Sequence, residues 1–280
     1  MFFDTHCHLN FGAFDGRVGE IVDRAKQAGV NQIVIPGTDI PTSEKAIAIA
    51  EEFEGVYAAV GIHPHHVFEI YNKARDRKFF DGKQQTVKNL VPSLSTLLSH
   101  PKVVAIGEVG IDRHIYQKTK YPDYKIEEEF VDLQKEFLIE QIKLVHKYKK
   151  SLIFHNREAK KDFLELLTTN YLLLTDYSSV FHCCEPDLEL LEFAKKHKIF
   201  IGVDGDIFYK KDKQEFIKKV PLEMLVLETD SPFLSPDQKF GNEPKNIKII
   251  AEFIAQLLNC SVDELAKQTT KNAEKLFNCR

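Results

Sequence analysis

Short apolar runs of strand length alternate along the chain with longer segments in which apolar residues recur at helical spacing. The apolar runs lie at 2–8, 31–37, 56–62, 103–109, 151–155, 178–183, 199–203 and 225–228. The segments of helical period lie at 17–29, 42–54, 90–99, 127–149, 158–170, 187–197, 211–219, 243–258 and 262–277. Strands that are apolar throughout are typical of a parallel sheet covered by helices. Eight strands alternating with helices therefore predict an α/β fold, the (β/α)8 TIM barrel.

Two segments depart from this alternation. Residues 73–88 are charged and weakly periodic, which predicts an exposed insertion. A long loop that contains tyrosine and lysine is predicted over residues 110–125. It overlaps the segment 114–128, whose role the sequence leaves open. Thr42 or Ser43 is expected to cap the helix at 42–54. The sequence shows no internal repeat or Pro/Ser-rich linker, so we expect one domain over residues 1–280.

Composition narrows the class of protein. The 280 residues suit a single barrel, and the net charge of −4 gives no overall basic field of the kind that nucleic-acid-binding domains often carry. We expect no membrane span, because no apolar run approaches the roughly 20 residues that a span requires. The N-terminal residues do not resemble a signal peptide. Five irregularly spaced cysteines favour reduced thiols and a cytoplasmic location.

Polar residues that follow the predicted strands are the candidates for chemistry, because active sites of such barrels lie at the carboxyl ends of the strands. On the first strand, alternation puts His6 and His8 on one face and Cys7 on the other. Residues of the types that commonly bind metal ions end five different predicted strands. They are His6 and His8 on the first, Glu108 on the fourth, His155 on the fifth, His182 on the sixth, and Asp230 on the eighth.

Imidazole and carboxylate together predict Zn²⁺, Mn²⁺ or a similar divalent ion rather than Ca²⁺. Six ligands exceed what one open catalytic zinc uses, so we expect two ions. His6, His8 and Asp230 are expected to hold one, the histidines of the fifth and sixth strands the other, and Glu108 can bridge them. Such a pair activates water and stabilises both oxygens of an in-line displacement. Its net positive charge would also attract phosphate to an acidic protein.

Eight stretches resemble one known family, in that family's order and over nearly the whole chain. They are Phe3-Asp-Thr-His-Cys-His-Leu9, Gly61-Ile-His-Pro-His65, Ala105-Ile-Gly-Glu-Val-Gly-Ile-Asp112, Leu152-Ile-Phe-His-Asn-Arg157, Phe181-His-Cys183, Leu227-Glu-Thr-Asp-Ser-Pro-Phe233, Asn242-Glu-Pro244 and Asn272-Ala-Glu-Lys-Leu-Phe277. The chain resembles the TatD family of metal-dependent hydrolases, which belong to the amidohydrolase-like barrels.

The resemblance implies a barrel of the metallo-dependent hydrolase type that hydrolyses phosphodiester bonds in nucleic acid. It implies the same six metal ligands, His6, His8, Glu108, His155, His182 and Asp230. Members are known as deoxyribonucleases, and some trim single strands from the 3′ end. We therefore expect DNA as substrate, zinc, magnesium or manganese as the two ions, and no obligate protein partner.

Three loops depart from the family pattern. Asn156 stands where the family often has Ser, Cys184-Glu-Pro186 replaces an aromatic-Ser-Gly run, and Gln238-Lys-Phe-Gly241 replaces a basic run. All three could contact substrate, so they leave its identity open. The alternative is an amidohydrolase-type hydrolase of an ester or amide, such as an aminoacyl-tRNA deacylase or a small-molecule hydrolase.

Individual roles follow from position. Asp230 and Glu108 are the expected catalytic carboxylates, with Asp230 as general base or, alternatively, only a helix cap before Ser231. Glu228 shares the face of Asp230, and we expect it either near the substrate or as the partner of a ligating histidine. Arg157 could clamp a phosphate or form an ordinary salt bridge.

His63 and His65 follow the third strand and could contact phosphate or donate a proton, or else belong to a polar loop. Asp112 is expected to orient a neighbour. A solvated loop is favoured over a stacking platform for the interleaved Tyr116, Lys118, Lys120, Tyr121, Tyr124 and Lys125. Strand alternation is expected to turn Cys183 away from the site, which makes it and Cys184 small core or rim residues.

Overall fold

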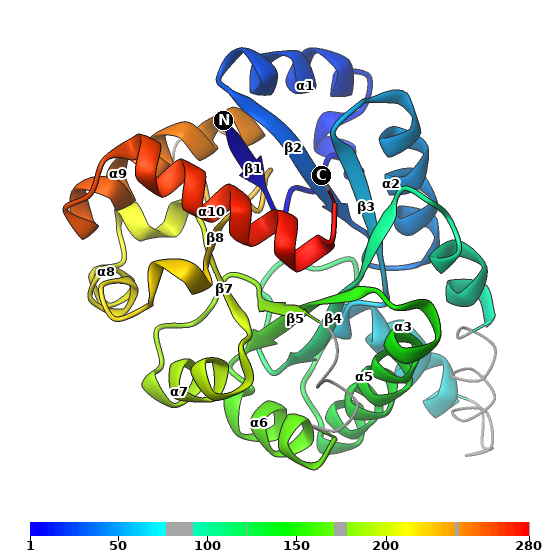
Figure 1. Cartoon of the computed structure of the whole chain (residues 1–280). Coiled ribbons are helices and arrows are strands. Elements are labelled where there is room, and N and C mark those ends of the chain that lie inside the picture. Colours follow the sequence, from blue (N-terminus) through cyan, green and yellow to red (C-terminus); the bar gives the residue numbers. More distant parts are fainter. Residues whose placement is uncertain (77–91, 122, 171–177, 239–240, 280) are drawn as a thin grey trace.

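The computed structural model describes residues 1–76, 92–121, 123–170, 178–238 and 241–279 (Figure 1). Eight strands form one sheet in the order β1 to β8, and each pairs with the next in parallel. They are β1 (Phe2–Asp4), β2 (Val30–Pro36), β3 (Val56–Val60), β4 (Val103–Asp112), β5 (Ser151–Arg157), β6 (Ser179–Phe181), β7 (Phe200–Val203) and β8 (Leu225–Leu227).

The sheet closes on itself through the residues that follow its first and last strands. The amide of Thr5 donates to the carbonyl of Leu227 at 3.0 Å, and the amide of Asp230 donates to the carbonyl of His6 at 2.9 Å. Cys7 and Ser231 form an isolated parallel bridge. The predicted (β/α)8 barrel is therefore confirmed, and its seam brings the first and eighth strand ends together.

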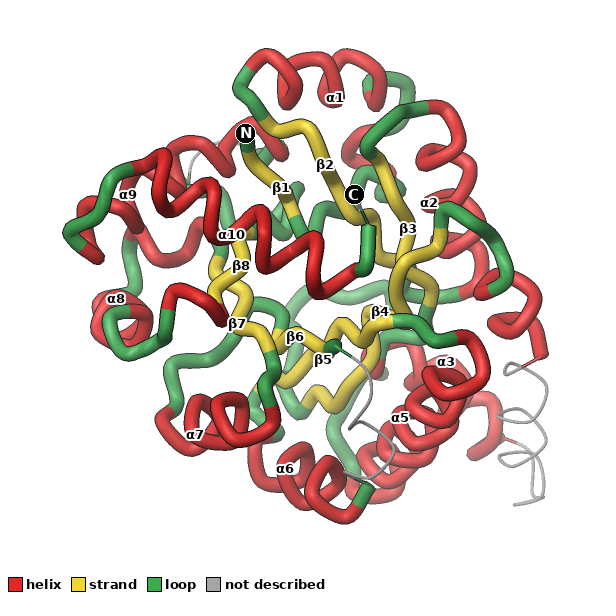
Figure 2. Tube along the Cα trace, in the orientation of Figure 1, coloured by secondary structure: helices red, strands yellow, loops and turns green. Residues whose placement is uncertain are grey.

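Helices surround the barrel (Figure 2). They are α1 (Val18–Gln27), α2 (Ile40–Glu52), α3 (Pro64–Asp76), α5 (Glu128–Tyr148), α6 (Lys160–Thr169), α7 (Leu188–His197), α8 (Lys211–Ile217), α9 (Ile247–Leu258) and α10 (Val262–Phe277), and residues 92–98 are helical as well. No helix within the described ranges is long and apolar enough to cross a membrane.

Two apolar clusters hold the layers together. The larger lies between the strands and the helices and includes Cys7, whose side chain is fully buried. The smaller fills the barrel with strand residues such as Val34 and Ile153. It continues into α10, which crosses the end of the barrel where the strands begin, and Phe277 packs on Phe3 with ring centroids 5.8 Å apart (Figure 1). Because α10 closes that end, ligands reach the barrel from the other end.

Two predicted details are wrong. Helix α2 begins at Ile40, and its cap is Asp39 rather than Thr42 or Ser43. The Asp39 carboxylate accepts from the Thr42 amide at 2.9 Å, and the Thr42 hydroxyl accepts from the Asp39 amide at 2.9 Å. This reciprocal box satisfies two amides of the first turn, so Thr42 occupies the third helical position instead of the cap.

The segment after β3 also differs from its prediction. Pro64 opens helix α3, which extends to Asp76, so residues 73–76 of the expected insertion are helical. The remainder of that insertion lies outside the described residues. Strand β4 extends to Asp112, three residues beyond its predicted end, and this shortens the loop before α5.

Candidate metal centre

A cavity of about 430 Å³ lies where the strands end, opposite α10. Most of the residues predicted for the site line it, namely His8, His63, His65, Glu108, His155, Arg157, His182 and Asp230. His6 lies beneath them with its side chain fully buried. The structure thus gathers at one end of the barrel side chains that are separated by more than two hundred residues in the sequence.

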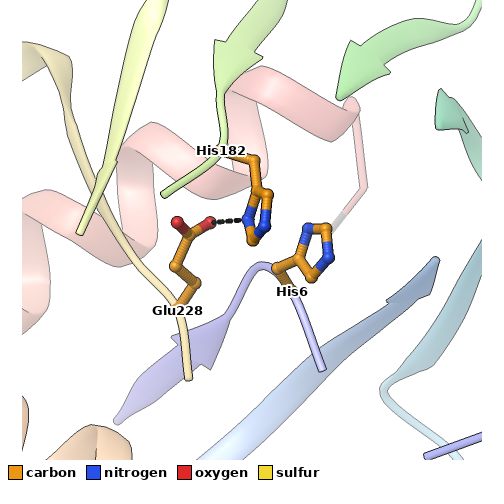
Figure 3. A group of neighbouring side chains, drawn as sticks. All are labelled: His6, His182 and Glu228. Carbon is orange, nitrogen blue, oxygen red and sulfur yellow. Dashed lines mark ion pairs between the residues drawn. The ribbon is translucent and has the colours of Figure 1, made fainter. Parts of the chain in front are cut away.

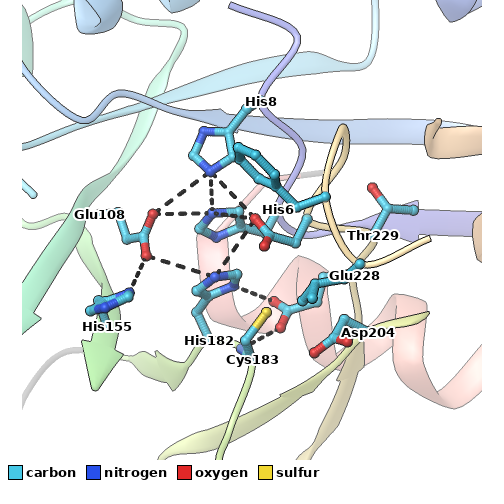
Figure 4. A network of polar contacts seen from close by, with 12 residues as sticks. His6, His8, Glu108, His155, His182, Cys183, Asp204, Glu228 and Thr229 are labelled. Atoms are coloured by element: carbon cyan, nitrogen blue, oxygen red, sulfur yellow. Dashed lines mark hydrogen bonds and ion pairs between the residues drawn. The ribbon is translucent and has the colours of Figure 1, made fainter. Parts of the chain in front are cut away.

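One oxygen of Glu108 faces the first histidine pair. Glu108 Oε2 lies 3.4 Å from His6 Nε2 and 3.7 Å from His8 Nε2, and the two nitrogens are 3.2 Å apart (Figure 4). Asp230 Oδ1 completes the group at 3.4 Å from His8 and 3.8 Å from His6. His6, His8 and Asp230 are the three side chains that the sequence predicts around one ion. Glu108 lies beside them.

The other oxygen of Glu108 faces a second group of histidines. Glu108 Oε1 lies 2.6 Å from His155 Nδ1, 3.4 Å from His63 Nε2 and 3.7 Å from His182 Nε2. His155 and His182 are the predicted pair. His63 joins them as a third donor, because its ligand atom lies within 4.8 Å of those of Glu108 and His155. His63 therefore lies in the donor cluster, on the short loop between β3 and α3.

Glu228 lies behind His182 and outside the cavity lining. Its Oε2 is 3.2 Å from His182 Nδ1, which leaves Nε2 facing Glu108, and the His182 ring stacks on His6 at 3.5 Å (Figure 3). Gly202 on β7 leaves the room that the Glu228 carboxylate fills. With an exposed fraction of 1% and its carboxylate on His182, Glu228 has the position expected of the partner of a ligating histidine, and its contact with substrate stays a prediction.

Asp112 holds His155 from the other side. Its Oδ2 lies 3.0 Å from His155 Nε2 and accepts from the Tyr116 hydroxyl at 2.6 Å, while its Oδ1 accepts from the His114 amide at 2.7 Å. The two ring nitrogens of His155 thus face two carboxylates. Asp112 therefore orients a neighbour, as its position in the sequence predicts.

Tyr116 forms part of the cavity wall rather than of a solvated loop. Its ring stacks on His65 with centroids 4.8 Å apart, and the Arg157 guanidinium lies 5.2 Å above its centroid. The prediction for this segment is therefore wrong at Tyr116, because the extension of β4 to Asp112 carries the tyrosine back over the site. His65 and Arg157 line the cavity through this stack.

Cys183 lines the cavity, although strand alternation predicts that its side chain points away from the site. Strand β6 ends at Phe181, and Cys183 adopts a left-handed backbone conformation with φ of 43°. Strand alternation therefore stops before Cys183, and its side chain lines the cavity with a ligand atom within 4.8 Å of those of His182 and Asp230. Cys184, in contrast, is buried in the outer apolar cluster, as expected.

Several residues to which the sequence assigns no role also line the cavity, among them Phe11, Asp206, Lys210 and Phe233. Glu185 lines it as well, and it belongs to a loop that the sequence marks as a possible substrate contact. Lys210 Nζ pairs with Asp206 at 2.8 Å, and both follow β7, the strand for which the sequence analysis named no site residue. The signal that could have found them is Asp204-Gly-Asp206, a polar run directly after an apolar strand.

Electrostatics favour a cation at the centre. Burial, reinforced by the neighbouring His182, lowers the pKa of His6 to about 4 and keeps this imidazole neutral, as a metal ligand must be. Burial also disfavours protons on His155 and His182, but their carboxylate partners outweigh it and raise the pKa values to about 9 and about 10. Burial opposes ionisation of Glu108, yet the imidazoles hold its pKa well below the usual range.

The donor set fits divalent metal ions. Buried imidazole nitrogens and carboxylate oxygens converge within 4.8 Å in the groups His6–His8–Glu108 and His63–Glu108–His155, and within these groups Glu108 is the sole side chain with a negative charge. Neutral nitrogen donors beside shared carboxylates match zinc and manganese chemistry. Two groups that share Glu108 could hold two ions.

The comparisons with known proteins agree with this chemistry. A family model described as TatD related DNase matches residues 3–278. The chain belongs to the TatD family. This places it among metal-dependent hydrolases.

Relatives within the TatD family cover the chain almost completely. The metal-dependent hydrolase YabD of Bacillus subtilis is 34% identical, with 99% of each chain covered. The human protein named deoxyribonuclease TATDN3 is 30% identical, over 98% of this chain and 93% of its own. The crystal structure of the Escherichia coli TatD homologue YJJV has a TM-score of 0.81 at 29% identity and covers 100% of this chain and 98% of its own. The chain is thus a metal-dependent hydrolase of the TatD family.

Tyr116→Phe is expected to lower kcat for metal-dependent hydrolysis about 10–100-fold while KM changes about twofold or less. The substitution removes the 2.6 Å hydrogen bond to Asp112 and so loosens His155, but it keeps the ring between His65 and Arg157. Steady-state kinetics on the purified protein measure both constants. Tyr148→Phe, on α5, is the matched control and should leave both unchanged. A rise in KM alone would contradict this role.

Proposed function

We propose that this TatD family member hydrolyses phosphodiester bonds of DNA with two divalent ions, Zn²⁺, Mg²⁺ or Mn²⁺. The observation that carries the proposal is the position of Glu108, which presents each of its oxygens to a different group of buried histidines. His6, His8 and Asp230 would hold one ion, and His155 and His182, with His63 within reach, the other. Bound ions supply the positive charge that activates water and stabilises the attacking and leaving oxygens.

Asp230 is the proposed general base. Burial opposes its ionisation, but the hydrogen bond with His8 and the charge of His182 lower its pKa, so the carboxylate is free to accept a proton. Its side chain keeps an exposed fraction of 14% at the cavity, where a water could approach. The amide of Asp230 donates to the carbonyl of His6 at 2.9 Å, which holds the backbone of Asp230 beside the histidines.

Two cationic side chains at the cavity support an anionic substrate. Arg157 is held over Tyr116 and could clamp a phosphate through its fork of donors. Lys210 lies beside Asp206 on the loop that follows β7. His65 supplies a ring nitrogen at the same cavity. These groups are proposed to position the phosphate, while Glu108 and Asp230 do the chemistry.

The size of the cavity favours the end of a strand. About 430 Å³ lies within the range of about 300–1,000 Å³ that binds small molecules, so a terminal nucleotide fits better than a duplex. We therefore propose exonucleolytic cleavage of single-stranded DNA. The human relative's name, deoxyribonuclease, supports DNA, and the 3′-to-5′ direction follows the resemblance to the family.

Metal reconstitution tests the proposal. Protein stripped with chelator is reloaded with Zn²⁺, Mg²⁺ or Mn²⁺ in turn, its metal content is measured by elemental analysis, and it is assayed on 3′- and 5′-labelled single-stranded oligonucleotides. We expect two ions per chain and release of mononucleotides from the 3′ end only when metal is present. No metal-dependent nucleotide release with any ion would refute the proposal.

One observation favours the alternative reaction. The Glu185 carboxylate lines the cavity, where it accepts from Asn156 Nδ2 at 3.3 Å, and its negative charge would suit the amino group of an aminoacyl ester. Hydrolysis of aminoacyl-tRNA by the same preparations tests this. Deacylation that exceeds nucleotide release by tenfold or more in kcat/KM would favour it over the nuclease.

The cellular setting stays a prediction. The cysteines Cys7, Cys183, Cys184, Cys260 and Cys279 are all free thiols, which supports a reducing compartment such as the cytoplasm. Activity of the purified chain alone would support the expectation that no partner protein is obligatory. Fractionation of cells with an antibody against the protein measures its location.

A further inference from the structure

Phe233 presents a large apolar side chain at the mouth of the cavity. Its exposed fraction is 52%, although it lies three residues after Asp230 and lines the same cavity. An exposed aromatic ring forgoes the free energy that its burial would contribute to folding. Where such a ring borders a binding site, it indicates a contact with the ligand. The question is whether the ring is exposed because its loop is loose or because the fold presents it.

The backbone of the Phe233 loop is tightly fixed. Asn242, with an exposed fraction of 1%, donates from Nδ2 to the carbonyls of Thr229 and Phe233, both at 2.8 Å. The Phe233 amide in turn donates to the carbonyl of Asp230 at 2.8 Å. A buried amide side chain thus holds the loop from both sides. The ring is exposed on a rigid support, which lowers the entropic cost of binding a ligand there.

Two further rings form a corner with Phe233. Phe11 stacks on His8 with centroids 4.2 Å apart and an interplanar angle of 15°. The Phe233 ring stands roughly perpendicular to both, 6.1 Å from Phe11 at 74° and 6.3 Å from His8 at 71°. A planar group held on this corner would therefore lie next to a candidate metal donor.

The rest of the cavity suits the other part of such a ligand. Arg157 and Lys210 give it positive charge, and the donor groups around Glu108 mark where the reacting phosphate would sit. A nucleotide is a ligand of this kind, with a planar base at one end and a phosphate at the other. We propose that Phe233, with Phe11, is a stacking subsite for the base of the nucleotide whose phosphodiester bond is cleaved. The inference rests on the proposed function and names a specificity residue for it.

Kinetics on matched substrates test the stacking. One single-stranded oligonucleotide carries a natural base at its 3′ end, and the other carries an abasic tetrahydrofuran nucleotide there. Phe233→Leu keeps an apolar side chain but has no ring, so KM for the first substrate is expected to rise about tenfold and KM for the abasic one to stay within about twofold. Phe233→Tyr keeps the ring and should restore the wild-type KM. An equal rise for both substrates, or no rise for either, overturns the inference.

Fluorescence gives a readout that needs no turnover. The sequence contains no tryptophan, so Phe233→Trp introduces a single reporter at the proposed subsite. Its emission is expected to be quenched by deoxyadenosine 5′-monophosphate and not by 2-deoxyribose 5-phosphate, which lacks the base. Ile249→Trp, at a position on α9 with an exposed fraction of 41%, is the control and should respond to neither. Equal responses at the two positions would count against the subsite.

The two readouts separate this inference from the proposed function. Quenching by the nucleotide without any hydrolysis of DNA would uphold a base-binding subsite and refute the nuclease. Hydrolysis of DNA with no quenching and unchanged KM in Phe233→Leu would uphold the nuclease and refute the subsite. Failure of both hydrolysis and quenching would refute both.

Discussion

Asp230→Asn is expected to lower kcat/KM for metal-dependent DNA hydrolysis about 10³-fold. The amide of asparagine cannot accept a proton from water, and it carries no negative charge opposite His6 and His8, which lie 3.8 and 3.4 Å from Asp230 Oδ1. Steady-state release of nucleotides from a labelled oligonucleotide measures the loss. Elemental analysis of the same sample shows how much metal the variant retains, which separates loss of the base from loss of an ion.

The matched control for this change is Asp23→Asn on the exposed face of α1. It makes the same substitution far from the cavity and should keep full activity. Both variants should unfold at temperatures close to that of the wild type, because Asp230 contributes to the site rather than to the apolar clusters. An Asp230→Asn protein that kept more than a tenth of the activity would exclude Asp230 as the base.

Glu108→Gln is expected to reduce the metal content from two ions to one or none and to lower kcat/KM by about 10³-fold. Glu108 faces one histidine group with Oε2 and the other with Oε1, and glutamine offers only one carbonyl oxygen for these two positions. The amide nitrogen on the other side repels a cation. Elemental analysis after dialysis against trace metal measures the stoichiometry directly.

Glu136→Gln, on the exposed side of α5, is the control for loss of a single carboxylate. Glu228→Gln gives a graded comparison, because Glu228 holds His182 from behind without lining the cavity, and its loss should cost about 10–100-fold. Two ions bound at full occupancy in Glu108→Gln would show that the carboxylate does not bridge them.

The barrel and the convergence of its strand-end side chains could be predicted because each rests on a local signal. Apolar strands such as 151–155 have a polar residue at one end, and the parallel order of the sheet brings those ends together. His6, His8 and Asp230 needed no knowledge of loops, since the seam between β1 and β8 places them side by side. Glu108 ends a strand of the same sheet, and its two oxygens face the two histidine groups.

The errors occur where a tertiary contact, and not the local sequence, decides where a strand ends or how a loop runs. Cys183 was placed by alternation, but β6 stops at Phe181 because His182 and Cys183 turn to meet Glu228, which lies 45 residues away. The local sequence predicts a solvated loop at Tyr116, whereas contacts with Asp112 and Arg157 hold this side chain over the cavity. Phe233 could not be recognised from the sequence either, because its exposure depends on Asn242 fixing the loop from a distance. Each of these positions is set by a tertiary contact that no local pattern contains.

The closure of the barrel by α10 has a consequence for how the protein is made. Among the elements of the barrel, β1 leaves the ribosome first and α10 last, yet Phe3 packs on Phe277 and the Met1 carbonyl accepts from Thr270. Strand β1, which His6 and His8 follow, can therefore pair with β2 early, but it meets β8 and α10 only near the end of synthesis. Contacts of such long sequence separation form slowly. A nascent chain would thus hold His6 and His8 without the carboxylate of Asp230 until β8 and the residues after it have been made.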